Sequence, residues 1–166
     1  VQLVLPGDLL WPQLYVRDHL QTVRCLTIAH TVDGAAISRA ARDKVKFPGI
    51  AAATEMAAAQ DRAFLAEQVI RMGRQTAFER MANTFMELHH RCGTTGLLHA
   101  DGFASALTQE SLGDLLGLSV VHVNRTLQLM RHESLISLKQ GRLTLLNISR
   151  LTEVGEFRPP TLTYLH

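Results

Sequence analysis

The chain has 166 residues, of which 46% are hydrophobic and 19% charged, and its formal net charge is +2. This composition supports a folded core and argues against disorder, and no run reaches the roughly 18 apolar residues of a membrane-spanning helix. Cys25 and Cys92 lack a CxxC motif or a Cys/His cluster, which argues against a disulfide framework or a zinc site. Without a visible secretory signal at its start, the chain is expected to be cytoplasmic.

Residues 1–47 are expected to form strands and one short helix. Residues 1–5 are an apolar run typical of a strand, and Pro6-Gly7-Asp8 is a turn signal, because Pro fixes φ and Gly accepts a positive φ. Residues 20–30 alternate in part, which predicts a strand buried on much of both faces, and a short helix is expected at about 35–46. The segment is too small to close a sheet or barrel by itself, so it resembles part of a larger β-unit.

Residues 48–92 carry long helical patterning, with Pro48 at the expected start and Gly93 at the expected end. Apolar or small residues recur with spacings of three and four from position 56 to position 77. Packing within one domain would explain one apolar stripe, but the apolar surface is wider, so we expect the helix to pair with a second copy of the chain. The predicted dimer interface consists of Met56, Ala59, Ala63, Ala66 and Ile70. Arg74-Gln75-Thr76 interrupts the pattern and predicts a break between two helices.

Residues 108–150 show the order helix, glycine turn, helix and hairpin. Thr108 can cap the first helix, and Gly117 can take the left-handed conformation that ends it. Ser119 can cap the second helix, and the apolar runs 135–138 and 142–146 flank a turn at residues 139–141. This is the order of a winged helix-turn-helix module. Residues 93–107 read as a linker or short hairpin, and the tail after Leu151 is expected to be extended.

The second helix of such a module is a recognition helix, whose first residues face the base edges of the DNA major groove. Arg125 can present two donors to guanine, and Asn124 could pair with adenine or simply be solvated. Val120 and Val121 could touch thymine methyl groups or pack against the wing. His122 is either a base reader or a polar surface residue. We predict base contacts from these five residues.

Phosphate contacts are predicted from the helix starts and the hairpin. Ser119, Thr108 and Gln109 lie where helix N–H groups attract an anion. Lys139 and Arg142 on the hairpin would give affinity and salt dependence. The basic excess of the chain is concentrated in this region: residues 108–150 hold Arg125, Arg131, Lys139, Arg142 and Arg150 against Glu110, Asp114 and Glu133.

Residues 107–127, from Leu-Thr-Gln-Glu-Ser-Leu to Asn-Arg-Thr-Leu, closely resemble the DNA-binding signature of the Crp/Fnr family, and residues 135–143 resemble its wing. Residues 50–75 resemble the family's dimerisation helix and residues 77–82 its helix after the hinge. The turn Leu5-Pro6-Gly7-Asp8 resembles the LPGD turn of its effector-binding β-roll.

The resemblance implies an α+β fold with a partial β-roll over residues 1–47, a dimerisation helix over 48–76, a winged helix-turn-helix over 77–151 and a tail over 152–166. It implies a transcriptional regulator, not an enzyme, that binds pseudo-palindromic double-stranded DNA as a homodimer. RNA polymerase is a further candidate partner. The alternative is a ligand-sensing or protein-interaction module whose winged helix does not bind DNA specifically.

Cofactor sites of the family are not matched. Cyclic-nucleotide binders place a Gly-Glu-Leu segment after the turn and an Arg-Ser-Ala cradle later, where this chain has Trp11-Pro12-Gln13-Leu14 and His19-Leu20-Gln21. The sequence therefore argues against cyclic-nucleotide binding. Two distant cysteines cannot hold an iron–sulfur cluster. The adjacent His89 and His90 point about 100° apart on a helix, so they cannot share one metal ion well. No cofactor is expected.

Overall fold

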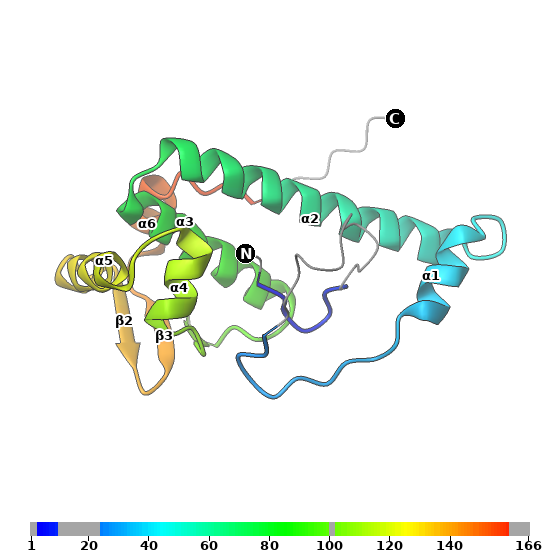
Figure 1. The fold of residues 1–166 in the computed structure, drawn as a ribbon, viewed down its shortest axis with the longest axis horizontal. Coiled ribbons are helices and arrows are strands. Elements are labelled where there is room, and N and C mark those ends of the chain that lie inside the picture. The colour runs from blue at the N-terminus through cyan, green and yellow to red at the C-terminus, as the bar shows by residue number, and fades with distance from the viewer. Residues whose placement is uncertain (1–2, 10–23, 100–101, 160–166) are drawn as a thin grey trace.

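The computed structural model describes residues 3–9, 24–99 and 102–159 (Figure 1). Within these ranges the chain is mostly helical, with one small antiparallel sheet of three strands. A long helix runs along one side of the molecule and joins a short helix at one end to a head of smaller elements at the other (Figure 1). None of the described helices is both long and apolar enough to cross a membrane.

Three helices follow one another along the first part of the described chain. They are α1 (Ala35–Arg42), α2 (Pro48–Arg74) and α3 (Ala77–Thr94). Helix α1 starts where the sequence predicts and ends at Arg42, before the expected position 46. Pro48 occupies the first turn of α2, where its missing N–H leaves no helical hydrogen bond unmade.

The predicted break at residues 74–76 is confirmed. Gln75 has extended backbone angles, φ −100° and ψ 146°, which end α2. Thr76 then caps α3: its hydroxyl accepts from the Glu79 N–H at 3.3 Å, and its own N–H donates to Glu79 Oε2 at 2.7 Å. This reciprocal capping box fixes the start of α3, so two independent helices replace one continuous helix.

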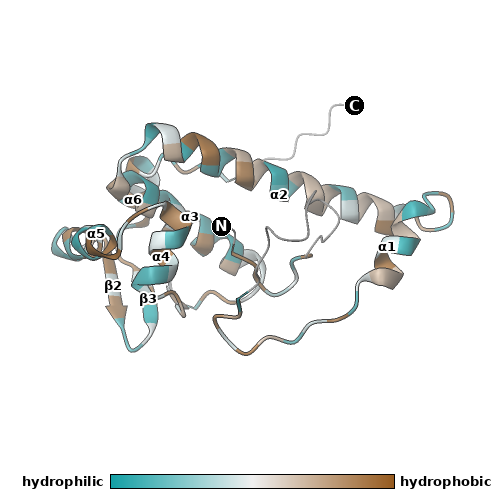
Figure 2. Cartoon of the chain, in the orientation of Figure 1, coloured by the Kyte–Doolittle hydropathy of each residue, from teal (hydrophilic) through white to brown (hydrophobic). Residues whose placement is uncertain are grey.

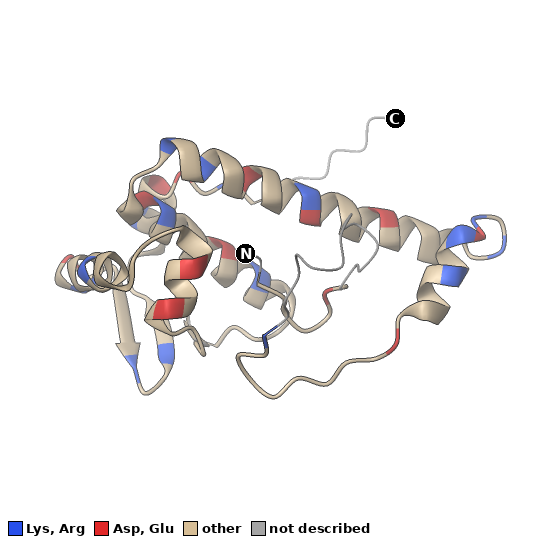
Figure 3. Cartoon of the chain, in the orientation of Figure 1, with Lys and Arg blue, Asp and Glu red and all other residues tan. Residues whose placement is uncertain are grey.

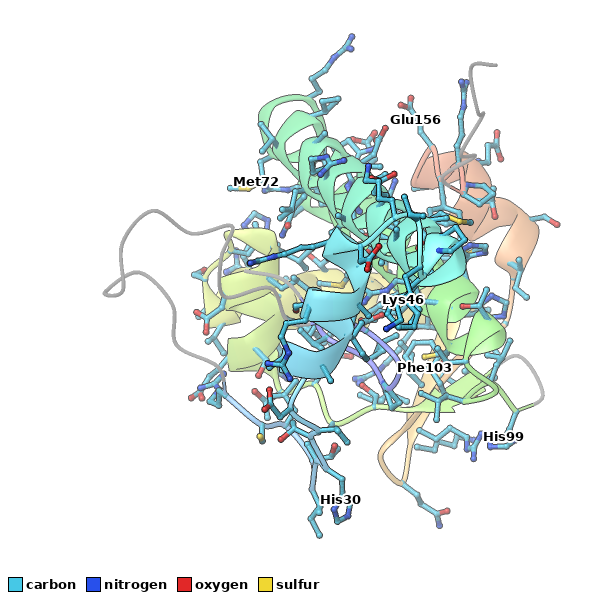
Figure 4. All side chains as sticks on the ribbon, turned by 90° about the vertical axis from the view of Figure 1, so that its right-hand side faces the viewer. His30, Lys46, Met72, His99, Phe103 and Glu156 are labelled. Carbon is cyan, nitrogen blue, oxygen red and sulfur yellow. The ribbon has the colours of Figure 1, made fainter. Side chains whose placement is uncertain are left out.

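The strands predicted at residues 1–5 and 20–30 are wrong for their described parts. Residues 3–5 and 24–30 form no strand, and residues 24–30 are all exposed; Ile28 is 92% exposed. His30 projects away from the body of the molecule (Figure 4). A strand is stable only beside a pairing strand, and none of the described residues provides one here. The β-roll is therefore not seen in the described residues.

The turn predicted at residues 6–8 is present. Gly7 has a φ of 94°, and the Asp8 N–H donates to the Leu5 carbonyl oxygen at 3.0 Å. Residues 11–14 and 19–21, on which the argument against cyclic-nucleotide binding depends, lie outside the described residues.

The head combines α3 with the elements that follow it. They are β1 (Gly102–Ala104), α4 (Gln109–Leu116), α5 (Val120–His132), β2 (Ile136–Lys139), β3 (Arg142–Leu145) and α6 (Ile148–Val154). The sheet has the order β1-β3-β2, with Leu143 opposite both Phe103 and Leu138. The region read as a linker or short hairpin thus adds the edge strand β1 to the wing.

The extended tail expected after Leu151 is wrong for residues 152–154, because they belong to α6. Asn147 caps this helix by accepting the Arg150 N–H at 2.9 Å. Leu151 is fully buried and joins Met81, Phe85, Val123 and Met130 as the most deeply buried large side chains of the head. The helix is therefore an integral part of the core.

Hydrophobic segments recur along α2 outside the head (Figure 2). Val69, Ile70 and Met72 are 71%, 51% and 54% exposed in the single chain. The core of the head is closed without these side chains, so α2 carries an apolar surface that the described part of the chain does not cover.

Candidate nucleic-acid interface

The turn between α4 and α5 has the geometry that the sequence predicts. Gly117 ends α4 in the left-handed conformation, with φ 64° and ψ 42°. The Leu118 N–H then donates to the Gly113 carbonyl oxygen at 2.9 Å. A Cβ on Gly113 would lie 2.7 Å from the Leu118 carbonyl oxygen, so only glycine fits this crossing without movement. This close approach sets the angle at which α5 leaves the turn.

Helix α5 has one buried and one exposed face. Val123, Leu127 and Met130 are 0–3% exposed and fix the helix in the core, as predicted. Ser119 caps its start by accepting the His122 N–H at 3.3 Å. The residues predicted to contact bases are all exposed and lie in the first two turns: Val120, Val121, His122, Asn124 and Arg125. Of these five, Val121, His122 and Arg125 line one groove together with the start of α3, whereas Val120 and Asn124 do not line it.

A groove of roughly 440 Å³ separates the start of α5 from the start of α3. Its lining comes from both helices: Thr76, Ala77 and Phe78, and Ser119, Val121, His122, Arg125, Thr126 and Leu129. Sequence reasoning did not assign the start of α3 to this site. The residue pair Thr76 and Glu79, which has the spacing of a capping box, is the local sequence signal for a helix start at this place.

The wing presents two basic side chains side by side. Gln140 and Gly141 both have positive φ, 51° and 71°, which makes a tight turn between β2 and β3. Lys139 is paired with Arg142 across the strands, and both are exposed. Figure 3 shows basic segments at this end of the hairpin. Arg142 Nη1 also lies 3.3 Å from the His99 and 3.4 Å from the Gly102 carbonyl oxygen, so it braces the sheet as well.

The start of α4 holds the two other predicted phosphate contacts. Thr108 accepts the Ser111 N–H at 3.1 Å, and Thr108 and Gln109 are both exposed. Arg24 approaches the same helix: its Nη2 donates to the Ser111 hydroxyl at 3.2 Å and lies 3.8 Å from Asp114 Oδ2. No local sequence signal connects Arg24 to a helix 87 positions away.

Polar side chains of α2 attach that helix to the head, which the sequence analysis did not find. Gln68 Nε2 donates to the Leu115 carbonyl oxygen at 3.0 Å, and Gln75 Nε2 donates to the Gly155 carbonyl oxygen at 3.1 Å. Arg71 is 6% exposed and bonds Asn83 and Glu87. The end of α2 is therefore held by directional bonds as well as by packing.

The predicted dimer residues share one property, which is that none is buried in the single chain. Ala59 and Ala63 are half-buried, Ala66 is exposed, and Met56 and Ile70 are 39% and 51% exposed. Small side chains on such a helix would let a second helix approach closely.

Among the residues the structure describes, no group of three or more His, Cys, Asp or Glu side chains could hold a metal ion. Cys92 is buried, and burial raises the pKa of its thiol, against a smaller lowering by the charge of Arg91. A thiol in this state is protonated at neutral pH and is a poor nucleophile.

Residues 79–154 match the family of Crp-like helix-turn-helix domains. The nitrogen fixation regulation protein FixK of Azorhizobium caulinodans is 35% identical to this chain over 80 residues, which are 48% of this chain and 32% of the relative. The structure of FixK2 from Bradyrhizobium japonicum has a TM-score of 0.62 with this one, at 23% identity over 78% of this chain and 61% of that chain. The chain thus has the same fold over that part, and spans less than two thirds of either protein.

Proposed function

We propose that this chain, which belongs to the Crp/Fnr family by its Crp-like helix-turn-helix domain, is a transcriptional regulator that binds a specific DNA sequence as a homodimer. The proposal has two parts. The head would read one half-site, and α2 would pair two chains so that two heads meet a pseudo-palindromic operator.

The surface at the start of α5 is the observation that carries the first part. Five exposed side chains of mixed chemistry lie there, and a guanidinium such as that of the exposed Arg125 can offer two parallel donors to a guanine. The starts of α4 and α5 are both capped, by Thr108 and Ser119, and the wing cations Lys139 and Arg142 are exposed at the hairpin end. In sequence-specific binding, contacts to phosphates position the protein on the DNA, and contacts to base edges select the sequence.

The exposed apolar surface of α2 supports the second part. A helix of 27 residues with Met56 and Ile70 exposed on the predicted interface would be stabilised by a second apolar surface. A twofold pairing along α2 would present two recognition helices to successive major grooves, with half-site centres about 34 Å apart.

Selection from a pool of random duplex DNA tests the proposed function. We expect enrichment of a pseudo-palindrome whose half-site centres are about one helical turn, roughly 10 base pairs, apart. A chain with Lys139 and Arg142 both replaced by Ala should enrich the same sequence with lower yield, because phosphate contacts carry affinity and little sequence information. Failure of the wild-type chain to enrich any sequence would contradict the regulator proposal and favour a protein-interaction module.

Charged substitutions on the predicted dimer face should separate the two copies. Ile70→Glu or Ala63→Glu would place a carboxylate in a desolvated interface, so we expect sedimentation velocity to show a monomer in place of a dimer. Gln60→Glu is the matched control, because Gln60 is an exposed residue of α2 outside the predicted interface. A dimer that persists in both variants would move the interface to another surface.

A further inference from the structure

Two almost fully buried arginines, Arg71 of α2 and Arg91 of α3, share one carboxylate between these helices. Arg71 Nη2 bonds Glu87 Oε2 at 3.0 Å, and Arg91 Nη1 bonds Glu87 Oε1 at 3.3 Å. The arginine side chains are only 8% and 9% exposed. Two cations beside one anion leave a positive excess, and an uncompensated charge is costly in a poorly solvated place.

The second carboxylate comes from the N-terminal turn. Asp8 Oδ2 accepts from Arg91 Nη2 at 2.6 Å, and the Leu3 carbonyl oxygen accepts from the same nitrogen at 2.9 Å. The same Asp8 oxygen accepts the Leu5 N–H at 2.7 Å, which holds the turn in its shape. With the turn in place, Arg71 and Arg91 face two carboxylates, those of Glu87 and Asp8, while Arg80 lines the same cavity as Arg71 and Glu87.

The network continues from Arg71 to the break between α2 and α3. Arg71 Nη1 donates to Asn83 Oδ1 at 2.5 Å, and Asn83 Nδ2 donates to the Gly155 carbonyl oxygen at 2.7 Å. Gln75, the residue that ends α2, bonds the same carbonyl.

Packing adds a second connection between the helices. The Arg91 guanidinium lies 5.2 Å from the centre of the Phe64 ring on α2, within the range of a cation–π contact. Through Arg91, Asp8 is therefore linked to a chain of bonds that runs along α2 and α3 to the end of α6 next to the break.

We propose that the turn of residues 3–8 is an intramolecular docking element that keeps α2 closed on α3. When the turn is seated, Asp8 adds a second carboxylate, beside that of Glu87, to the cations Arg91 and Arg71. When the turn leaves, the buried excess charge favours separation of α2 from α3, so that water can reach the arginines. The seating of the N-terminal segment is thereby coupled to the angle between α2 and the head. This inference does not depend on DNA binding.

Hydrogen exchange of the full chain, measured by mass spectrometry on peptides, tests the proposal. In Asp8→Asn we expect residues 71–80 to exchange about tenfold faster than in the wild type, the size expected for losing a charge-assisted hydrogen bond. These peptides report the bonds from the Gln75 N–H to the Arg71 carbonyl and from the Arg80 N–H to the Thr76 carbonyl. Glu133→Gln, which removes one negative charge from an exposed position outside the network, should leave the rates unchanged.

The pattern of exchange decides the outcome. Faster exchange confined to residues 3–9 would overturn the proposal, because the turn would then dock without affecting the helices. An equal increase throughout the head, including α5, would also overturn it as a general loss of stability. In a chain that already carries Arg91→Lys, Asp8→Asn should add little, since the paired donors of the guanidinium are gone; a fully additive effect would contradict the coupling.

Discussion

Replacing Arg125 by Ala is expected to remove most of the discrimination between the selected DNA sequence and a shuffled sequence. Arg125 is exposed near the start of α5, beside the groove that this helix shares with α3. A bidentate contact to guanine contributes about 1–3 kcal/mol of discrimination at each half-site. Binding measured over a series of salt concentrations should show a specific affinity that falls about tenfold or more, with a nearly unchanged dependence on salt.

Lys139→Ala should give the opposite result. Without the Lys139 ammonium at a phosphate, binding is expected to weaken for all sequences, and the slope of log affinity against log salt should fall by about one for each phosphate that the protein no longer neutralises. Gln128→Ala, a change at an exposed position of the same helix α5, serves as the control for both variants. If Arg125→Ala weakened all sequences equally and reduced the salt slope, Arg125 would bind phosphate, and the base-reading role would be wrong.

Gly113→Ala is expected to destabilise the head by about 1–3 kcal/mol, the usual cost of forcing a methyl group into a packed core. The added Cβ would lie 2.7 Å from the Leu118 carbonyl oxygen, and that atom belongs to the backbone that connects α4 to α5. Relief of the clash would require the turn to move. Chemical denaturation should therefore show a lower midpoint with a similar slope.

Gly93→Ala is the matched control for this effect. Gly93 is also a helical glycine, in α3, but its added Cβ would meet only Leu98 Cδ2 at 3.7 Å, an ordinary contact. Because Ala restricts the unfolded chain more than Gly does, this variant should be unchanged or more stable by roughly 0.4–1 kcal/mol. Equal stability of the two variants would show that the crossing at Gly113 tolerates a methyl group.

The helix-turn-helix could be predicted because its signals are local. Thr108, Ser119 and Gly117 each act within a few residues of their own position, by capping a helix or by adopting a left-handed backbone. The spacing of Val123, Leu127 and Met130 likewise follows from helical periodicity alone. These features need no knowledge of the rest of the fold, so sequence reasoning finds them.

The missed features depend on partners that are distant in sequence. The apolar alternation at 20–30 predicts a strand, but a strand also needs a neighbour, and the described residues offer none. Strand β1 has only three residues and forms because β3 is available beside it. Arg71 and Arg91 look like surface residues in the sequence, and only the fold brings Asp8 and Glu87 to them.

The length of α2 has a mechanical consequence. A helix of 27 residues extends about 40 Å, and one end of it is fixed at the break next to the head. A change of about 10° at that break would carry the α1 end through about 7 Å, by simple leverage on this length. The same relation between angle and displacement holds in the other direction. A displacement of several Å at the α1 end changes the angle at the break, and so the orientation of the head, by only a few degrees. Large displacements of the α1 end of α2 therefore correspond to small changes in the orientation of the head.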